Sequence, residues 1–100
     1  MPHIGLIRET EHGEVIAQLK ASGFDFRIVE RAPVSSACVR FIDPYGDTVF
    51  NQLQLSVLAA ELRAIGELAA EPDLRANIEQ VLRFIASSEG VHVYVRFLGD

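Results

Sequence analysis

Three side chains near the C-terminus could do chemistry together. His92, Tyr94 and Arg96 lie two residues apart, and apolar residues stand between them. This alternation predicts a strand over residues 91–98 with one buried face. Side chains two apart on a strand point the same way and lie about 7 Å from each other. The predicted row holds an imidazole that can act as a general base and a guanidinium that can bind carboxylate or phosphate.

Other residues could extend this row if the last strand pairs with a neighbouring one. Residues 38–42 and 48–51 have strand patterns, so such pairing would bring Arg40 or Asn51 to the same face. The carboxamides around Asn51 could instead satisfy donors at the start of a helix. The candidate ligand-binding or interface residues are Arg40, Tyr45, Asp47, Asn51, Gln54, His92, Tyr94 and Arg96.

No arrangement of residues in the sequence specifies a reaction. There is no Gly-rich phosphate loop, no GxSxG motif and no HExxH motif. Cys38 is the only cysteine, which excludes an internal disulfide, and we expect it to be a buried core residue rather than a nucleophile. His3, His12 and His92 lack metal-ligand spacing. We therefore assign no catalytic residue, no metal and no cofactor, and the sequence leans away from an enzyme without deciding it.

The length and composition fit a single domain over residues 1–100. Hydrophobic residues make up 49% of the chain, which is enough for one core. The net charge of −5 repels phosphate backbones, so we expect no nucleic-acid partner. The sequence shows no signal-peptide pattern and no apolar run of about eighteen residues. These features predict a cytoplasmic protein that does not associate with a membrane.

The N-terminal third has two interpretations. Alternating apolar residues over 3–8 and 14–19, around a polar stretch, predict a β-hairpin. The competing interpretation is a helix over residues 10–22, because the apolar residues there also suit one helical face. We prefer the hairpin, because the helix would carry Gly13 near its start and bury only a narrow stripe. Alternation over residues 24–29 predicts a third strand.

The segment from Phe41 to Phe50, which reads FIDPYGDTVF, has the residues of a tight turn between two strands. Asp43 can accept a hydrogen bond from the backbone ahead of it, and Pro44 presets its own φ angle at the second turn position. Gly46 can take a positive φ. We therefore predict a second β-hairpin here.

After residue 54 the apolar spacing changes from two to about 3.6, which predicts a helix over about residues 55–70. Ser56 could cap its start. A second helix is predicted over about residues 72–88, with Pro72 in its first turn. The short connection predicts an antiparallel helix pair. The predicted fold is α+β, with a mainly antiparallel sheet of five or six strands, the helix pair packed on one face, and the C-terminal strand at 91–98.

Two stretches are distinctive as a pair. They are FIDPYGDTVFNQLQ at residues 41–54 and VHVYVRFLGD at residues 91–100. Together they resemble a group of small bacterial proteins of unknown function, some of which are carried on mobile integron gene cassettes. The resemblance covers about half of the chain. The group has no established activity, so the resemblance implies no functional residue.

The residues permit two hypotheses from different classes of function. The leading one is a non-catalytic interaction protein, either a homo-oligomer such as a homodimer or a partner-binding domain of the immunity type. It rests on the acidic composition and on a strand with Tyr94 and Arg96 that could form a sheet edge. The alternative is a small-molecule-binding protein or modest enzyme that uses His92, Tyr94 and Arg96 with Arg40.

Overall fold

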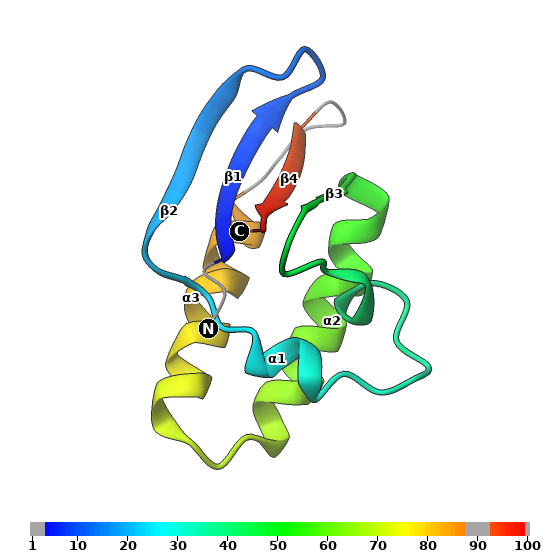
Figure 1. Cartoon of the computed structure of the whole chain (residues 1–100), viewed down its shortest axis with the longest axis vertical. Helices are drawn as coiled ribbons and strands as arrows, with labels where there is room; N and C mark the ends of the chain where they lie inside the picture. Colours follow the sequence, from blue (N-terminus) through cyan, green and yellow to red (C-terminus); the bar gives the residue numbers. More distant parts are fainter. Residues whose placement is uncertain (1–3, 88–92, 100) are drawn as a thin grey trace.

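The strands form one antiparallel sheet in the order β2-β1-β4-β3 (Figure 1). The computed structural model describes residues 4–87 and 93–99, with residues 20–22 described by their backbone only. The strands are β1 at Ile4–Thr10, β2 at Val15–Phe24, β3 at Asp47–Phe50 and β4 at Val93–Leu98. The C-terminal strand therefore lies inside the sheet, and the expectation that it could form an edge is wrong.

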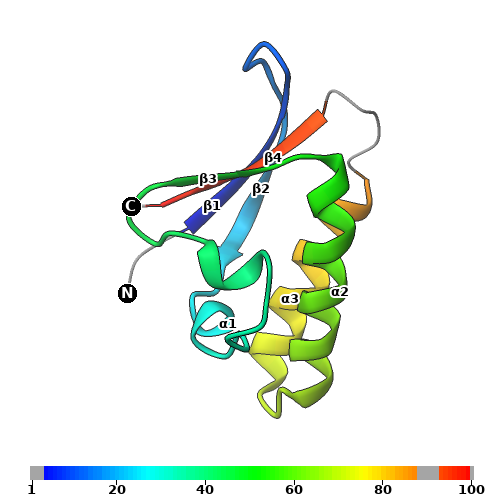
Figure 2. The same cartoon turned by 90° about the vertical axis from the view of Figure 1, so that its right-hand side faces the viewer.

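Two long helices pack side by side on one face of the sheet (Figure 2). These are α2 at Gln52–Leu68 and α3 at Pro72–Ala86. Two short helices, α1 at Arg27–Glu30 and the 3-10 helix η1 at Val39–Phe41, complete the fold. The predicted α+β class, with an antiparallel sheet, a helix pair on one face and a C-terminal strand, is confirmed. Within the described residues, no helix has both the length and the apolar character needed to cross a membrane.

The start of α2 lies earlier than its apolar spacing suggests. Asn51 caps it, because its side chain accepts a hydrogen bond from the backbone N–H of Gln54, and the Gln54 side chain accepts one from the backbone N–H of Asn51. The prediction that Ser56 caps this helix is wrong. Its hydroxyl donates to the carbonyl of Leu53 inside the first turn. Pro72 begins α3, as predicted.

The N-terminal hairpin is confirmed over the alternative helix. β1 and β2 pair antiparallel, and Gly13 in the connecting turn has a φ of 80°. Such a φ favours glycine, because a Cβ atom would crowd the backbone. Gly13 is therefore required by the turn of the hairpin, and the same residue made a helix start improbable.

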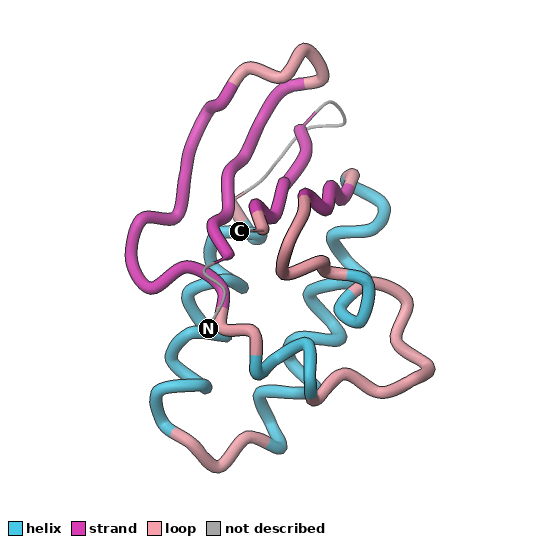
Figure 3. Tube along the Cα trace, viewed as in Figure 1, coloured by secondary structure: helices cyan, strands magenta, loops and turns pink. Residues whose placement is uncertain are grey.

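Two segments that we expected to be strands are helical instead (Figure 3). Residues 24–29 leave β2 and enter α1, where the Asp25 carboxylate accepts a 2.9 Å hydrogen bond from the backbone N–H of Arg27. Residues 38–42 contain η1, because the Glu61 carboxylate on α2 accepts from three successive backbone N–H groups at its start. An acceptor from a distant helix thus replaces a sheet partner.

The Glu61 carboxylate should make stability depend on pH. Burial raises the pKa of this carboxyl, but the three N–H donors outweigh it, so its pKa lies below the usual value of 4.5. A lowered pKa adds stability that is present above the unfolded value and is lost as pH falls through the folded value. We expect the free energy of unfolding, measured with urea, to fall more steeply between about pH 5 and pH 3 in the wild type than in Glu61→Gln. Equal slopes would contradict this prediction.

The turn before β3 is only partly as predicted. Asp43 Oδ1 accepts a 2.8 Å hydrogen bond from the Tyr45 N–H, which confirms its turn role. No second hairpin forms, since the segment before the turn is η1. Gly46 does not take a positive φ. A Cβ on Gly46 would lie only 2.8 Å from Asp43 Oδ2. The Gly99 N–H donates a 2.8 Å hydrogen bond to the Gly46 carbonyl, and this close approach requires glycine at position 99, where a Cβ would collide with the backbone of Gly46.

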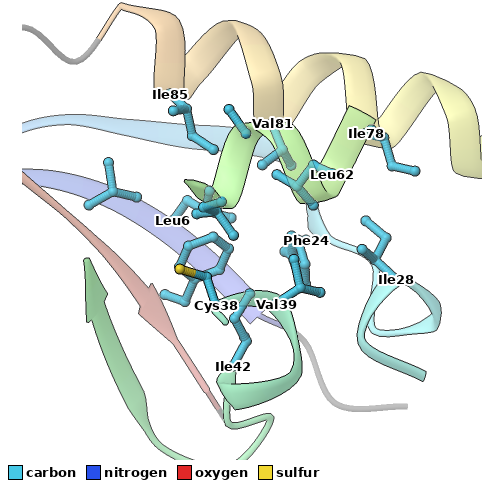
Figure 4. Close-up of a cluster of buried hydrophobic side chains, with 14 of the residues drawn as sticks. Leu6, Phe24, Ile28, Cys38, Val39, Ile42, Leu62, Ile78, Val81 and Ile85 are labelled. Carbon is cyan, nitrogen blue, oxygen red and sulfur yellow. The ribbon is translucent and has the colours of Figure 1, made fainter. Parts of the chain in front are cut away.

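The hydrophobic core lies between the helix pair and the sheet (Figure 4). Leu62, Ile78 and Val81 from the two helices meet Leu6 and Phe24 from the sheet. The Phe97 ring on β4 is fully buried and packs edge-to-face against the rings of Phe24 and Phe50, with centroids 5.0 and 5.7 Å away. Strands from both sides of β4 are thereby fixed to it.

Candidate functional site

The candidate site is the sheet face opposite the helices. On β4, Val95 and Phe97 are fully buried toward the helices, so Tyr94 and Arg96 point to the other side. The face is completed by the register partners of these two residues and by the start of β3. We call this the outer face, and its residues are Ile7, Glu9, Asp47, Val49, Tyr94 and Arg96. None of the described helices covers it (Figure 2).

Arg96 is the centre of the outer face. Its Nε donates to Glu9 Oε1 at 2.8 Å, and its Nη1 donates to Asp47 Oδ2 at 3.2 Å. Glu9 is only 6% exposed although none of the described helices lies over it, and its carboxylate contacts Arg96. Two carboxylates therefore fix the guanidinium in one position before any partner arrives. Such preorganisation lowers the entropy cost of binding.

The sequence predicted part of this cluster. Asp47, Tyr94 and Arg96 were candidate residues, and the structure places all three on one face. Glu9 was missed. It is 87 positions from Arg96, and only the order of β1 and β4 in the sheet brings the two together. A single acidic residue within an alternating strand was the available signal.

Arg40 does not join the outer face. It lies in η1, where its Nε donates to the Ser36 carbonyl at 2.9 Å and its guanidinium stacks 4.4 Å from the Phe41 ring centroid. The hydrogen bond to Ser36 ties the loop before η1 to η1 itself. The expectation that Arg40 shares a strand face with Arg96 fails because residues 38–42 are not a strand.

The remaining candidates have local roles or fall outside the description. Asn51 and Gln54 form the capping box of α2, which accounts for both amides. The Tyr45 side chain lies at the turn before β3 and is 75% exposed. His92 lies outside the described residues. The predicted row thus contributes Tyr94 and Arg96 to the candidate site.

Both edges of the sheet are poorly suited to pairing with another strand. The register of β2 shifts twice against β1, between Ile4 and Leu6 and between Arg8 and Glu9. Such irregularities turn the outward N–H and C=O groups out of line. The other edge strand, β3, has only four residues. The outer face is therefore a better candidate for contact with another protein than either edge.

Cys38 is a buried core residue, as predicted. It is 4% exposed, and its thiol donates weakly to the Gln54 carbonyl at 3.8 Å. Burial, together with the nearby charge of Glu61, raises the pKa of this thiol. A thiol held in its neutral form is a poor nucleophile, so the geometry does not support covalent chemistry at Cys38.

Comparison of the chain with protein-family models, with curated proteins and with solved structures finds no match.

Proposed function

We propose that this chain is a non-catalytic protein-interaction domain that forms a homodimer through its outer face. The observation that carries the proposal is the ion-paired Arg96 beside Tyr94 in the middle of a sheet face that no described helix covers. Tyrosine and arginine are enriched in protein interfaces, where they supply large contact areas with polar tips.

A second copy is compatible with this face because most of its charge is cancelled locally. The two carboxylates of Glu9 and Asp47 and the guanidinium of Arg96 leave one net negative charge. Two such faces can meet with little repulsion, and each keeps its own ion pairs. A twofold axis requires one surface that complements itself, and the absence of a large charge of one sign removes the main electrostatic obstacle to this.

Apolar side chains border the charged centre. Ile7 on β1 and Val49 on β3 lie directly opposite Arg96 in the two ladders. Val15 pairs with Glu9 and is 53% exposed, so it extends the apolar surface along the projecting β1–β2 hairpin (Figure 1). Stacking two sheets about 10 Å apart would bury these groups.

Size-exclusion chromatography with light scattering over a concentration series tests the proposal. We expect a mass of twice the 11.1 kDa chain at high concentration. Val49→Lys should weaken the dimer by at least about tenfold, because it places an ammonium group in the centre of a buried face.

The matched control is Val57→Lys. Val57 lies on α2 and is 42% exposed, close to the 39% of Val49. We expect this variant to dimerise like the wild type. A wild-type protein that stays monomeric at every concentration refutes self-association, and equal weakening by the two variants refutes the assignment to the outer face.

Two further expectations belong with this proposal. The free, buried Cys38 suits a reducing compartment, so we place the protein in the cytoplasm. The likeness to cassette-borne bacterial proteins rests on the segments around β3 and β4, which pair antiparallel. Those segments supply Asp47, Val49, Tyr94 and Arg96 of the outer face, so a shared interaction surface would account for the likeness.

A further inference from the structure

A cavity of about 410 Å³ lies away from the outer face, between α2 and the loop that joins α1 to η1. Small-molecule sites typically enclose about 300 to 1,000 Å³. Most of the wall is apolar, and its apolar residues are Pro33, Ala64, Ile65, Leu68 and Ala69. Leu68 is 88% exposed, which is unusual for a leucine beside a cavity. An apolar ligand would remove this side chain from water.

One end of the cavity is polar and incompletely satisfied. Ser36 lines it, is only 6% exposed, and its hydroxyl has no hydrogen-bond partner. The neighbouring backbone groups are already used, because the Ser36 N–H donates to the Pro33 carbonyl and the Ser36 carbonyl accepts from Arg40. A buried hydroxyl without a partner costs free energy. Because the Ser36 Oγ is closed off from solvent, a rotation about χ1 is needed to turn it into the cavity, where a ligand with a hydrogen-bonding group would remove that cost.

Glu61 determines which ligand charge the polar end of the cavity can accept. Its Oε1 accepts from the N–H groups of Cys38 and Val39, whereas its Oε2 accepts only from Ala37. A carboxylate oxygen can accept two hydrogen bonds, so Oε2 retains one acceptor position. The carboxyl is ionised at neutral pH, since its pKa lies below 4.5. It would attract a donor and repel an anion.

The opening of the cavity is held in place by an ion pair. Arg31 lines the cavity, and its guanidinium binds both carboxylate oxygens of Glu71 at the start of α3. Because this arginine is already paired, it does not reverse the negative charge of Glu61. The loop is thus tied to α2 by Glu61 and to α3 by Arg31, which gives the cavity a fixed wall.

We infer that this cavity binds a small molecule with an apolar body and a neutral hydroxyl head group, which exchanges hydrogen bonds with the Ser36 hydroxyl and donates to Glu61 Oε2. The apolar body would lie along Ile65 and Leu68. A carboxylate head group of the same size would face the ionised Glu61 and bind more weakly.

Titration of the protein with octanol and with octanoate, followed by calorimetry and amide chemical shifts, tests this inference. The two probes share an apolar chain and differ in head group. We expect saturable binding of octanol, with shifts at Ser36, Ile65 and Ala69, and at least about tenfold weaker binding of octanoate. Equal binding of the two probes, or octanol shifts confined to the outer face, would overturn the assignment.

Two variants locate the ligand. Ser36→Ala should keep or raise the melting temperature, because it removes a hydroxyl without a partner, and should weaken octanol binding about threefold to tenfold. Ala64→Leu should abolish binding by filling the cavity from α2. Ala60→Leu, on an exposed position of the same helix outside the cavity wall, is the matched control and should bind octanol like the wild type.

The proposal fails if Ser36→Ala binds octanol as tightly as the wild type, or if Ala64→Leu and Ala60→Leu behave alike. A melting temperature that drops in Ser36→Ala would show a structural role for the hydroxyl and would also count against it. None of these variants touches the outer face, so their results are independent of the dimer test.

Discussion

Replacing Glu61 with alanine should lower the free energy of unfolding by about 3 kcal/mol. The Glu61 carboxylate accepts hydrogen bonds of 2.5, 3.1 and 2.9 Å from the N–H groups of Ala37, Cys38 and Val39. Val39 is fully buried and Cys38 nearly so, which keeps water from taking the place of the carboxylate. Charge-assisted hydrogen bonds are about twice as strong as neutral ones. Urea unfolding monitored by circular dichroism measures the loss.

Glu67→Ala is the control for this prediction. Glu67 is exposed on the same helix, so its removal should change stability by no more than about 0.5 kcal/mol. If the two variants lose the same amount, the three N–H groups find other acceptors and the anchoring role of Glu61 is refuted.

Asn77→Ala should cost about 2 to 3 kcal/mol. Asn77 is 5% exposed on the inner side of α3, where its Oδ1 accepts from the Asp25 N–H at 2.9 Å and its Nδ2 donates to the Gly23 carbonyl at 2.7 Å. This amide joins α3 to the bend where the chain leaves β2. Its removal leaves a buried donor and a buried acceptor unpaired, and amide hydrogen exchange at Asp25 should become faster.

Asn77→Leu separates hydrogen bonding from packing. Leucine fills a similar volume without a polar group, so this variant should lose about as much stability as Asn77→Ala. A leucine variant as stable as the wild type would show that volume, not hydrogen bonding, accounts for the effect. Arg75→Ala, at an exposed position of α3, should remain within about 0.5 kcal/mol of the wild type.

Local periodicity correctly predicted the elements whose backbone hydrogen bonds lie within the element or between neighbouring segments of the chain. The α2 and α3 helices follow from apolar spacing, and the N-terminal hairpin follows from alternation around Gly13. Residues 38–42 are mostly apolar and suit a strand, yet they contain η1, because Glu61, 22 positions away, accepts a hydrogen bond from the N–H of Val39. No pattern within the segment records an acceptor that comes from elsewhere in the chain.

For the candidate site, too, the sequence predicted what lies on one strand but not the contacts between strands. Tyr94 and Arg96 share a face because alternation on one strand requires it. The contacts of Arg96 with Asp47 and with Glu9 depend on the order of the strands rather than on spacing within one strand. Spacing therefore did not reveal either contact, and Glu9 was missed. The unpaired hydroxyl of Ser36 could not be predicted either, because it results from the packing of the α1–η1 loop against α2.

The position of β4 within the sheet has a consequence for how the chain is made. β1 and β3 have no ladder between them and are joined only through β4, which is the last described strand to leave the ribosome. A nascent chain that ends after α3 can hold the β1–β2 hairpin and the helix pair, but Phe24 and Phe50 would lack the Phe97 ring that separates them. Cooperative folding of this sheet must therefore wait until β4 has been synthesised, and until then the apolar side of the hairpin is a surface for chaperones.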